Sequence, residues 1–298
     1  MIPRDRAFLL TALSLLLGCG SGEGPPREAG EPQPGRPGLQ GPRIELQDAS
    51  GRILTLGHRP GRILSLVPSA SETLLAIGAG DRLVGRTDFD SEPRLFDLPS
   101  VGGGLHPNLE AILALRPELV IRFAGDTDTR TPNRLDQMGI PHFAIDPRGI
   151  EEVRGIVRDL GVITGEEEKA ARVLAEMEAS LEGIRERVRD RPRLKVAYLL
   201  GGSPPLVAGP ESYIHELLAV AGGENAFADL SKVYGPVNTE AFLAREIDLL
   251  LAAEGAEISL PHVDIPLRRV SPALEIPGPG LAQAALEMAR AIHPEVFR

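Results

Sequence analysis

Few residues in this 298-residue sequence have the types and spacing that catalysis or metal binding requires. The six histidines never occur in H-x-x-H or H-E-x-x-H spacing, which disfavours a dedicated zinc or manganese cage. There is no G-x-S-x-G elbow, and no nearby histidine offers a base to Ser69 or Ser71. Ser69, three residues before Glu72, instead predicts a capping box at the start of a helix. We therefore expect no catalytic residue, no bound metal, no cofactor and no enzymatic activity.

The only cysteine, Cys19, ends a segment typical of secreted proteins. Two N-terminal arginines precede an apolar run from Ala7 to Leu17, which is too short to span a bilayer comfortably. The sequence Leu16-Leu17-Gly18-Cys19 looks like a bacterial lipobox, in which Cys19 is lipidated and becomes the mature N-terminus. An ordinary signal peptide with an incidental cysteine is the alternative. A lone cysteine also excludes an intramolecular disulfide.

Residues 20–42 are rich in Gly, Pro, Glu, Arg and Gln and offer almost nothing to bury. This composition predicts a disordered tether between the lipid anchor on Cys19, at the end of a lipoprotein signal peptide over residues 1–19, and a folded domain. We expect the protein in the periplasm or on an extracytoplasmic membrane surface, where an ATPase or kinase would find no nucleotide. A net charge of −10 and a pI near 5.2 argue against a nucleic-acid partner.

A long amphipathic helix is predicted from Glu166 to Arg191, and the rest of the chain is arranged around it. It contains one glycine, no proline, and apolar residues spaced by three and four positions, which form one stripe. The flanking segments 108–121 and 238–251 share Asn, Glu, Ala, Leu and Ala in step, and each reads as a short helix running into an apolar strand. A chance match between Ala- and Leu-rich helices is the alternative. We expect an N-terminal lobe at 43–164, a bridging helix at 165–191 and a C-terminal lobe at 192–298.

Strands alternating with helices on both sides of the long helix predict α/β lobes with parallel sheets. Ligands bind such sheets beyond the carboxyl ends of the strands, where the loops holding Phe89, Gly104 to His106 and Phe123 are expected. The triple glycine at 102–104 lacks the Lys-Ser/Thr of a P-loop and the spacing of a dinucleotide fingerprint. His106 at this loop mouth is either a surface residue or an isolated ligand.

Five segments of the sequence form a recognisable set of motifs: Arg62–Gly85, Ser91-Glu92-Pro93, Asn108-Leu109-Glu110, Arg116–Val120 and Gly222–Asn225. Together they resemble the substrate-binding proteins of cobalamin and iron-siderophore ABC importers, and most closely the cobalamin-binding members. The resemblance covers about residues 44 to 292. It implies two α/β lobes with mostly parallel sheets, bridged by a single long helix, with the ligand cleft between the lobes.

The resemblance also implies partners. In this family a glutamate on each lobe docks onto the membrane permease, which works with its own ATPase, and the matching residues are Glu110 and Glu240. Either glutamate alone is also explained as an exposed carboxylate favoured by a helix start. We expect a monomer whose membrane contact runs through the lipid on Cys19. An orphan sensor that hands its ligand to a receptor would keep the cleft but need not keep both glutamates.

The ligand follows less directly from the sequence. Alignment through the family motifs places five residues at cleft positions: Phe89, Gly104, Phe123, Leu206 and Tyr234. His106 is a further ligand-binding candidate. A corrinoid is the leading ligand, although Gly104 and Leu206 replace large stacking surfaces. A ferric siderophore or haem is the alternative, with His106 or Tyr234 as axial ligand, and Arg86, Arg122 or Arg148 meeting anionic groups. A tethered α/β hydrolase is the remote alternative.

Overall fold

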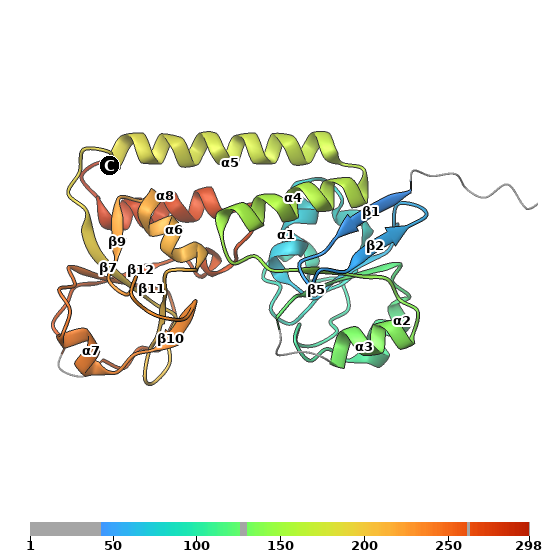
Figure 1. The fold of residues 1–298 in the computed structure, drawn as a ribbon, viewed down its shortest axis with the longest axis horizontal. Coiled ribbons are helices and arrows are strands. Elements are labelled where there is room, and N and C mark those ends of the chain that lie inside the picture. Colours follow the sequence, from blue (N-terminus) through green and yellow to red (C-terminus); the bar gives the residue numbers. More distant parts are fainter. Residues whose placement is uncertain (1–42, 126–129, 261–262, 298) are drawn as a thin grey trace, which may run out of the picture. The chain divides into compact units, whose positions relative to one another are not determined.

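The computed structural model describes residues 43–125, 130–260 and 263–297. The signal segment, the lipobox Cys19 and the expected tether lie outside these residues. We call the elements that precede the long helix α5 the N-lobe and those that follow it the C-lobe (Figure 1). None of the helices in the described ranges combines the length and hydropathy that crossing a membrane requires.

The N-lobe is built on a four-stranded parallel sheet in the order β4-β3-β5-β6. Its strands are β3 (Ile63–Ser65), β4 (Leu83–Gly85), β5 (Leu119–Phe123) and β6 (His142–Ile145), and an antiparallel hairpin of β1 (Ile44–Gln47) and β2 (Ile53–Leu56) precedes them. Its helices are α1 (Pro68–Ala76), α2 (Leu109–Leu115), α3 (Arg130–Gln137) and α4 (Ile150–Thr164), with short 3-10 helices at Gly80–Arg82 and Pro93–Leu95. Strands β3, β5 and β6 are buried on both faces, as parallel strands covered by helices should be.

The C-lobe has a mixed sheet in the order β10-β8-β7-β11-β12, with β9 also pairing β7. Its strands are β7 (Leu194–Leu199), β8 (Leu206–Ala208), β9 (Gly223–Asn225), β10 (Tyr234–Pro236), β11 (Leu249–Ala253) and β12 (Leu267–Val270). Its helices are α6 (Tyr213–Val220), α7 (Thr239–Leu243) and α8 (Leu281–Ile292), with a 3-10 helix at Pro272–Glu275. Strands β7, β9, β11 and β12 run parallel, whereas β8 is antiparallel to both of its neighbours, β7 and β10. The prediction of mostly parallel α/β sheets is confirmed.

Helix α5 (Glu167–Val188) connects the two lobes (Figure 1). Its first half packs on α4 of the N-lobe, and its second half packs on α8 and α6 of the C-lobe. The buried stripe consists of Ala170, Met177, Leu181, Ile184 and Val188, all of which belong to the predicted apolar stripe. Val173 and Leu174 of that stripe are only partly buried and pack at the edges of the cores.

The internal repeat is visible in the structure. Helix α2 runs into β5 and helix α7 runs into β11, and both strands lie inside their sheets. Each helix begins at an asparagine whose side chain accepts backbone N–H groups: Asn108 from Glu110 and Ala111, and Asn238 from Ala241.

The capping box predicted at Ser69 is wrong. Pro68 occupies the first helical position of α1, so the N-cap is Val67 and Ser69 lies already inside the helix. The Ser69 hydroxyl is buried and makes no hydrogen bond in the described part of the chain. The prediction used only the three-residue spacing between Ser69 and Glu72. It did not consider that a proline favours the first helical position, which places the helix start at Pro68.

Candidate ligand-binding site

An apolar cavity of about 560 Å³ lies at the carboxyl ends of β3 and β5 in the N-lobe. Its lining residues are Leu66, Val67, Pro68, Phe89, Gly103, Gly104, Leu105, His106 and Phe123. Four of the six ligand-binding residues predicted from the sequence are therefore on one cavity: Phe89, Gly104, His106 and Phe123. Sequence reasoning missed Leu66 to Pro68, although they directly follow β3 and the same end-of-strand rule applies to them.

The loop after β4 presents Phe89 to solvent, with 69% of its surface exposed. Asp90, which is buried, anchors this loop because its Oδ2 accepts hydrogen bonds from the Thr87 backbone N–H and hydroxyl, both at 2.7 Å. The Thr87 Oγ1 in turn accepts the Phe89 backbone N–H at 3.2 Å. Such a buried network fixes the backbone beneath the ring, so the loop presents the exposed phenyl group at the cavity.

Gly104 is required by the close approach of two backbones. A Cβ at this position would lie 2.1 Å from the carbonyl oxygen of Leu66, which no side chain can tolerate without a backbone shift. At the neighbouring Gly103, a Cβ would meet only the Phe89 ring at 3.6 Å, an ordinary contact. The glycine at 104 therefore closes the floor of the cavity, and the loss of a stacking side chain there follows from local packing.

Leu206 and Tyr234 do not line this cavity. They lie in the C-lobe on the antiparallel pair β8 and β10, where Leu206 stands opposite Pro236 and Tyr234 stands opposite Ala208. Burial, and to a lesser degree the charge of Glu275, raises the pKa of Tyr234 to about 12. Tyr234 thus stays a neutral phenol that can donate a hydrogen bond.

Glu275 is the centre of a cluster of phenols in the C-lobe. The Tyr198 hydroxyl donates a hydrogen bond to Glu275 Oε1 at 3.1 Å, and the Tyr213 hydroxyl donates to the Leu274 carbonyl at 3.3 Å. Burial raises the pKa of the Glu275 carboxyl, which the Tyr198 hydrogen bond partly offsets. All three tyrosines of the sequence thus lie around this carboxyl. Nothing in the spacing of the sequence indicated this assembly.

A second carboxyl, Glu72 on α1, is strongly perturbed. Burial, and to a lesser degree the neighbouring carboxylates Glu92 and Asp90, raises its pKa from 4.5 to about 7. Asp90 and Glu92 belong to the same loop as Phe89, and Glu72 lies one helical turn after Pro68 on the partly exposed side of α1. Glu72 is therefore close to the loop that carries Phe89, although it is not among the residues that line the cavity.

The three arginines considered for anionic ligand groups are engaged within the N-lobe. Arg86 donates to the Thr87 carbonyl and lies over the Phe96 ring, and Arg148 pairs with Asp146 at 2.7 Å. Arg122 is buried and donates to His142 Nδ1 at 3.0 Å, to the Phe123 carbonyl and to Ser50. None of the three is among the residues that line the cavity.

His106 is exposed at the rim of the cavity. Within the described ranges, no group of three or more His, Cys, Asp or Glu side chains is arranged to hold a metal ion. His106 is thus available to a ligand as a single imidazole.

The two glutamates expected to dock onto a permease occupy matching exposed positions. Glu110 is in the first turn of α2 and Glu240 in the first turn of α7, each two residues after its capping asparagine. One turn later each helix exposes a leucine, Leu113 at 48% and Leu243 at 64%. Few large apolar side chains are this exposed, and these two stand at equivalent positions of the repeat.

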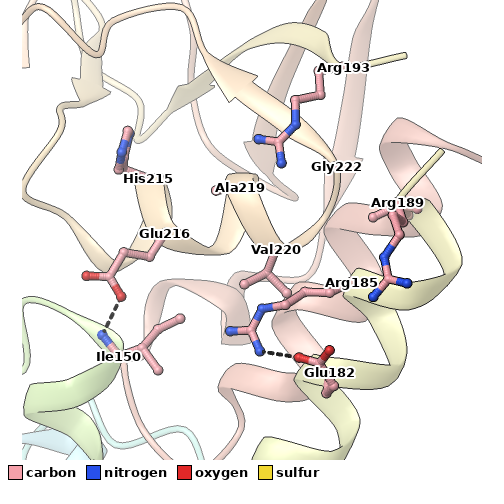
Figure 2. Close-up of a pocket in the computed structure, with 11 residues that line it drawn as sticks. Ile150, Glu182, Arg185, Arg189, Arg193, His215, Glu216, Ala219, Val220 and Gly222 are labelled. Atoms are coloured by element: carbon pink, nitrogen blue, oxygen red, sulfur yellow. Dashed lines mark hydrogen bonds and ion pairs between the residues drawn. The ribbon is translucent and has the colours of Figure 1, made fainter. Parts of the chain in front are cut away.

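A second cavity, of about 600 Å³, lies between α5, α6 and the start of α4 (Figure 2). Arg185 and Glu182 form an ion pair at 3.1 Å on one side of it. On the other side, Glu216 of α6 accepts the backbone N–H of Ile150 at 3.0 Å, which satisfies a free donor at the start of α4. This contact ties the C-lobe to the N-lobe, and the polar character of the cavity contrasts with the apolar one.

Residues 63–260, about two thirds of the sequence, match the periplasmic binding protein family. The chain belongs to this family. A vitamin B12-binding protein of Vibrio campbellii is 28% identical over 65% of this chain and 71% of the relative. An uncharacterized ABC transporter substrate-binding lipoprotein of Bacillus subtilis, YvrC, is 25% identical over 98% of this chain and 97% of the relative.

Among solved structures, the apo periplasmic haem-binding protein RhuT from Roseiflexus sp. RS-1 superimposes with a TM-score of 0.69. It is 25% identical in sequence, and the match covers 79% of this chain and 98% of that one. The predicted family and its fold of α/β lobes are confirmed. The characterised relatives are named for two different flat tetrapyrrole ligands, so the family alone leaves the ligand of this chain open.

Proposed function

We propose that this periplasmic binding protein is a lipid-anchored, extracytoplasmic receptor that captures a corrinoid and delivers it to an ABC importer. The observation that carries this proposal is the apolar N-lobe cavity, with Phe89 and Phe123 at the carboxyl ends of parallel strands. A broad, apolar surface with fixed aromatic rings suits a large flat ligand, because stacking on such rings adds about 0.5–1.5 kcal/mol beyond area burial.

The lipid anchor rests on the N-terminal sequence. Cys19 ends a lipobox-like segment, and the B. subtilis relative that aligns with nearly the whole chain is named a lipoprotein. Lipid on Cys19 and the polar stretch 20–42 together would hold the folded unit close to a bilayer, as a tethered receptor requires.

Delivery to an importer is supported by the paired exposed sites on the two lobes. Glu110 with Leu113 and Glu240 with Leu243 offer a carboxylate and an apolar contact at equivalent positions. A permease with basic residues on its outer surface is the partner that such a pair fits. A receptor that serves only as a sensor has no need of two matching contacts.

Haem or a ferric siderophore is the alternative ligand, and the RhuT similarity favours haem. The two candidate axial ligands, Tyr234 and His106, differ in how readily each could bind iron. Tyr234 binds iron only as a phenolate, and its burial beside Glu275 disfavours that form, whereas His106 is exposed at the cavity. A hydrolase is disfavoured because the relatives are solute-binding proteins and the Ser69 hydroxyl, inside α1, has no base hydrogen-bonded to it among the described residues.

The test is isothermal titration of residues 20–298 with cyanocobalamin, haem and ferric siderophores, each in a separate titration. One-to-one binding of cyanocobalamin with a submicromolar Kd supports the proposal, and Phe89→Ala should weaken it at least tenfold. Binding of an iron complex alone would retain the receptor role and replace the ligand. Absence of binding with all ligands, together with turnover of generic esters, would replace the receptor by an enzyme.

A further inference from the structure

The hydroxyl of Thr87 connects a buried carboxylate to the backbone of the exposed ring at the N-lobe cavity. Thr87 is completely buried, and its Oγ1 donates a hydrogen bond to Asp90 Oδ2 at 2.7 Å. The same oxygen accepts the backbone N–H of Phe89 at 3.2 Å. Because an amide N–H only donates and a carboxylate only accepts, the hydroxyl must serve both partners at once. One side-chain oxygen therefore couples Phe89 to Asp90.

The loop that carries Phe89 is also fastened to the glycine-rich loop that lines the same cavity. The backbone N–H of Asp88 donates to the Gly102 carbonyl at 3.0 Å, and the Ser100 hydroxyl donates to Asp88 Oδ1 at 2.5 Å. Ser100 Oγ in turn accepts the Gly102 N–H at 3.0 Å. The backbone of Phe89 thus lies between two anchored neighbours, Asp88 on one side and Asp90 on the other.

The Phe89 ring, in contrast to its backbone, has little packed around it. It is largely exposed, and it stands over Gly103, where there is no side chain to touch it. The direction of such a ring is set mainly by the backbone from which it projects. A ring and loop that had to be ordered during binding would weaken the affinity, whereas a preorganised ring avoids this cost.

We propose that Thr87 is a positioning residue, whose hydroxyl directs the Phe89 ring to the cavity before a ligand arrives. Ligand affinity then depends on this hydroxyl only through Phe89. The inference deepens the proposed function, on which its ligand-binding measurement rests. The alternative role for Thr87 is a local turn that stabilises the loop without any effect on the ring. The two roles differ in what removal of the hydroxyl does at residue 89.

The first experiment uses the absence of tryptophan from the sequence. Phe89→Trp places a single indole at the cavity, and the decay of its fluorescence anisotropy reports fast ring motion without any ligand. Thr87→Val, which removes the hydroxyl at similar shape, should increase the amplitude of this motion roughly twofold. Thr87→Ser keeps the hydroxyl and should restore the original amplitude. In the control, Phe123→Trp on β5 of the same cavity should show no change with either substitution at Thr87.

The second experiment is a double-mutant cycle on binding of cyanocobalamin, or of haem if only haem binds, to residues 20–298. Thr87→Val should weaken binding about three- to tenfold, which is the cost of ordering the ring and its loop. Thr87→Ser should change the affinity by less than about twofold, because it retains the oxygen. In the Phe89→Ala background, Thr87→Val should also change it by less than about twofold, because the ring through which Thr87 acts is gone.

Hydrogen exchange on the unmodified chain supplies a measurement that needs no variant to fold. The amide of Phe89 should exchange at least about tenfold more slowly than an amide of an unstructured peptide, since the hydrogen bond to Thr87 must open first. This protection is expected although the Phe89 side chain is exposed.

Four results overturn the inference. They are unchanged motion of the indole at position 89 in Thr87→Val, an equal increase of motion at position 123, an equal loss of affinity with and without the Phe89 ring, and unprotected exchange of the Phe89 amide. Failure of both cyanocobalamin and haem to bind would remove the proposed ligands. The anisotropy and exchange measurements would still decide whether Thr87 positions the ring.

Discussion

Glu72→Gln should stabilise the protein at alkaline pH and not at acidic pH. Burial beside Asp90 and Glu92 raises the pKa of Glu72 from 4.5 to about 7, so the folded protein holds this proton more tightly than the unfolded chain does. Stability contributed by the protonated form is present below about pH 4.5 and is lost as the pH rises to about 7. Glutamine is uncharged at every pH and avoids the loss.

The size of the effect follows from the pKa. At about 1.4 kcal/mol per tenfold change in proton affinity, the rise corresponds to roughly 3 kcal/mol. The carboxyl is partly open to solvent, which screens its interactions and reduces the expected gain to roughly 1–2 kcal/mol. For a folded unit of this size, that gain raises Tm by roughly 2–6 °C at pH 8.

The assay is thermal unfolding by circular dichroism at pH 4.5, 6 and 8, comparing Glu72→Gln with the unmodified chain at each pH. Titrating groups other than Asp90 and Glu92 contribute equally to both proteins, so the difference reports the charge at residue 72 together with its coupling to these two neighbours. The control Glu176→Gln, on the exposed side of α5, should shift Tm by less than 1 °C throughout. A gain of equal size at pH 4.5 and pH 8 would refute the reasoning, because it would show that charge is not the cause.

Two further predictions concern the cavity floor and the docking sites. Gly104→Ala forces the backbone away from the Leu66 carbonyl, so it should cost about 1–3 kcal/mol of stability and weaken ligand binding at least tenfold. Gly103→Ala should leave the stability unchanged, and equal losses of stability in calorimetry would refute the close-approach argument. Charge reversal by Glu110→Arg or Glu240→Arg should impair transport in a reconstituted importer at unchanged ligand affinity. Normal transport by both variants would refute the proposal that these glutamates dock onto the permease.

Local patterns in the sequence were enough to place most elements. The long helix predicted from Glu166 to Arg191 is found as α5, Glu167–Val188. This prediction succeeds because a stripe of apolar residues with helical spacing can be buried in only one way. The repeat was visible for the same reason, since its two copies must bury the same positions, and the family motifs then predicted the lobed fold.

The features that only the tertiary structure decided depend on contacts between distant segments of the chain. Pro68 displaced the predicted cap at Ser69, and the backbone of Leu66 demands the glycine at 104. The sequence could not predict the pKa of Glu72 either, because burial and neighbouring carboxyls set the proton affinity of this side chain. Glu275 gained its phenol neighbours only when β7, β10 and the turn before α8 came together. Sequence spacing specifies which residues share an element, whereas a charge acts through space on whatever the fold brings near it.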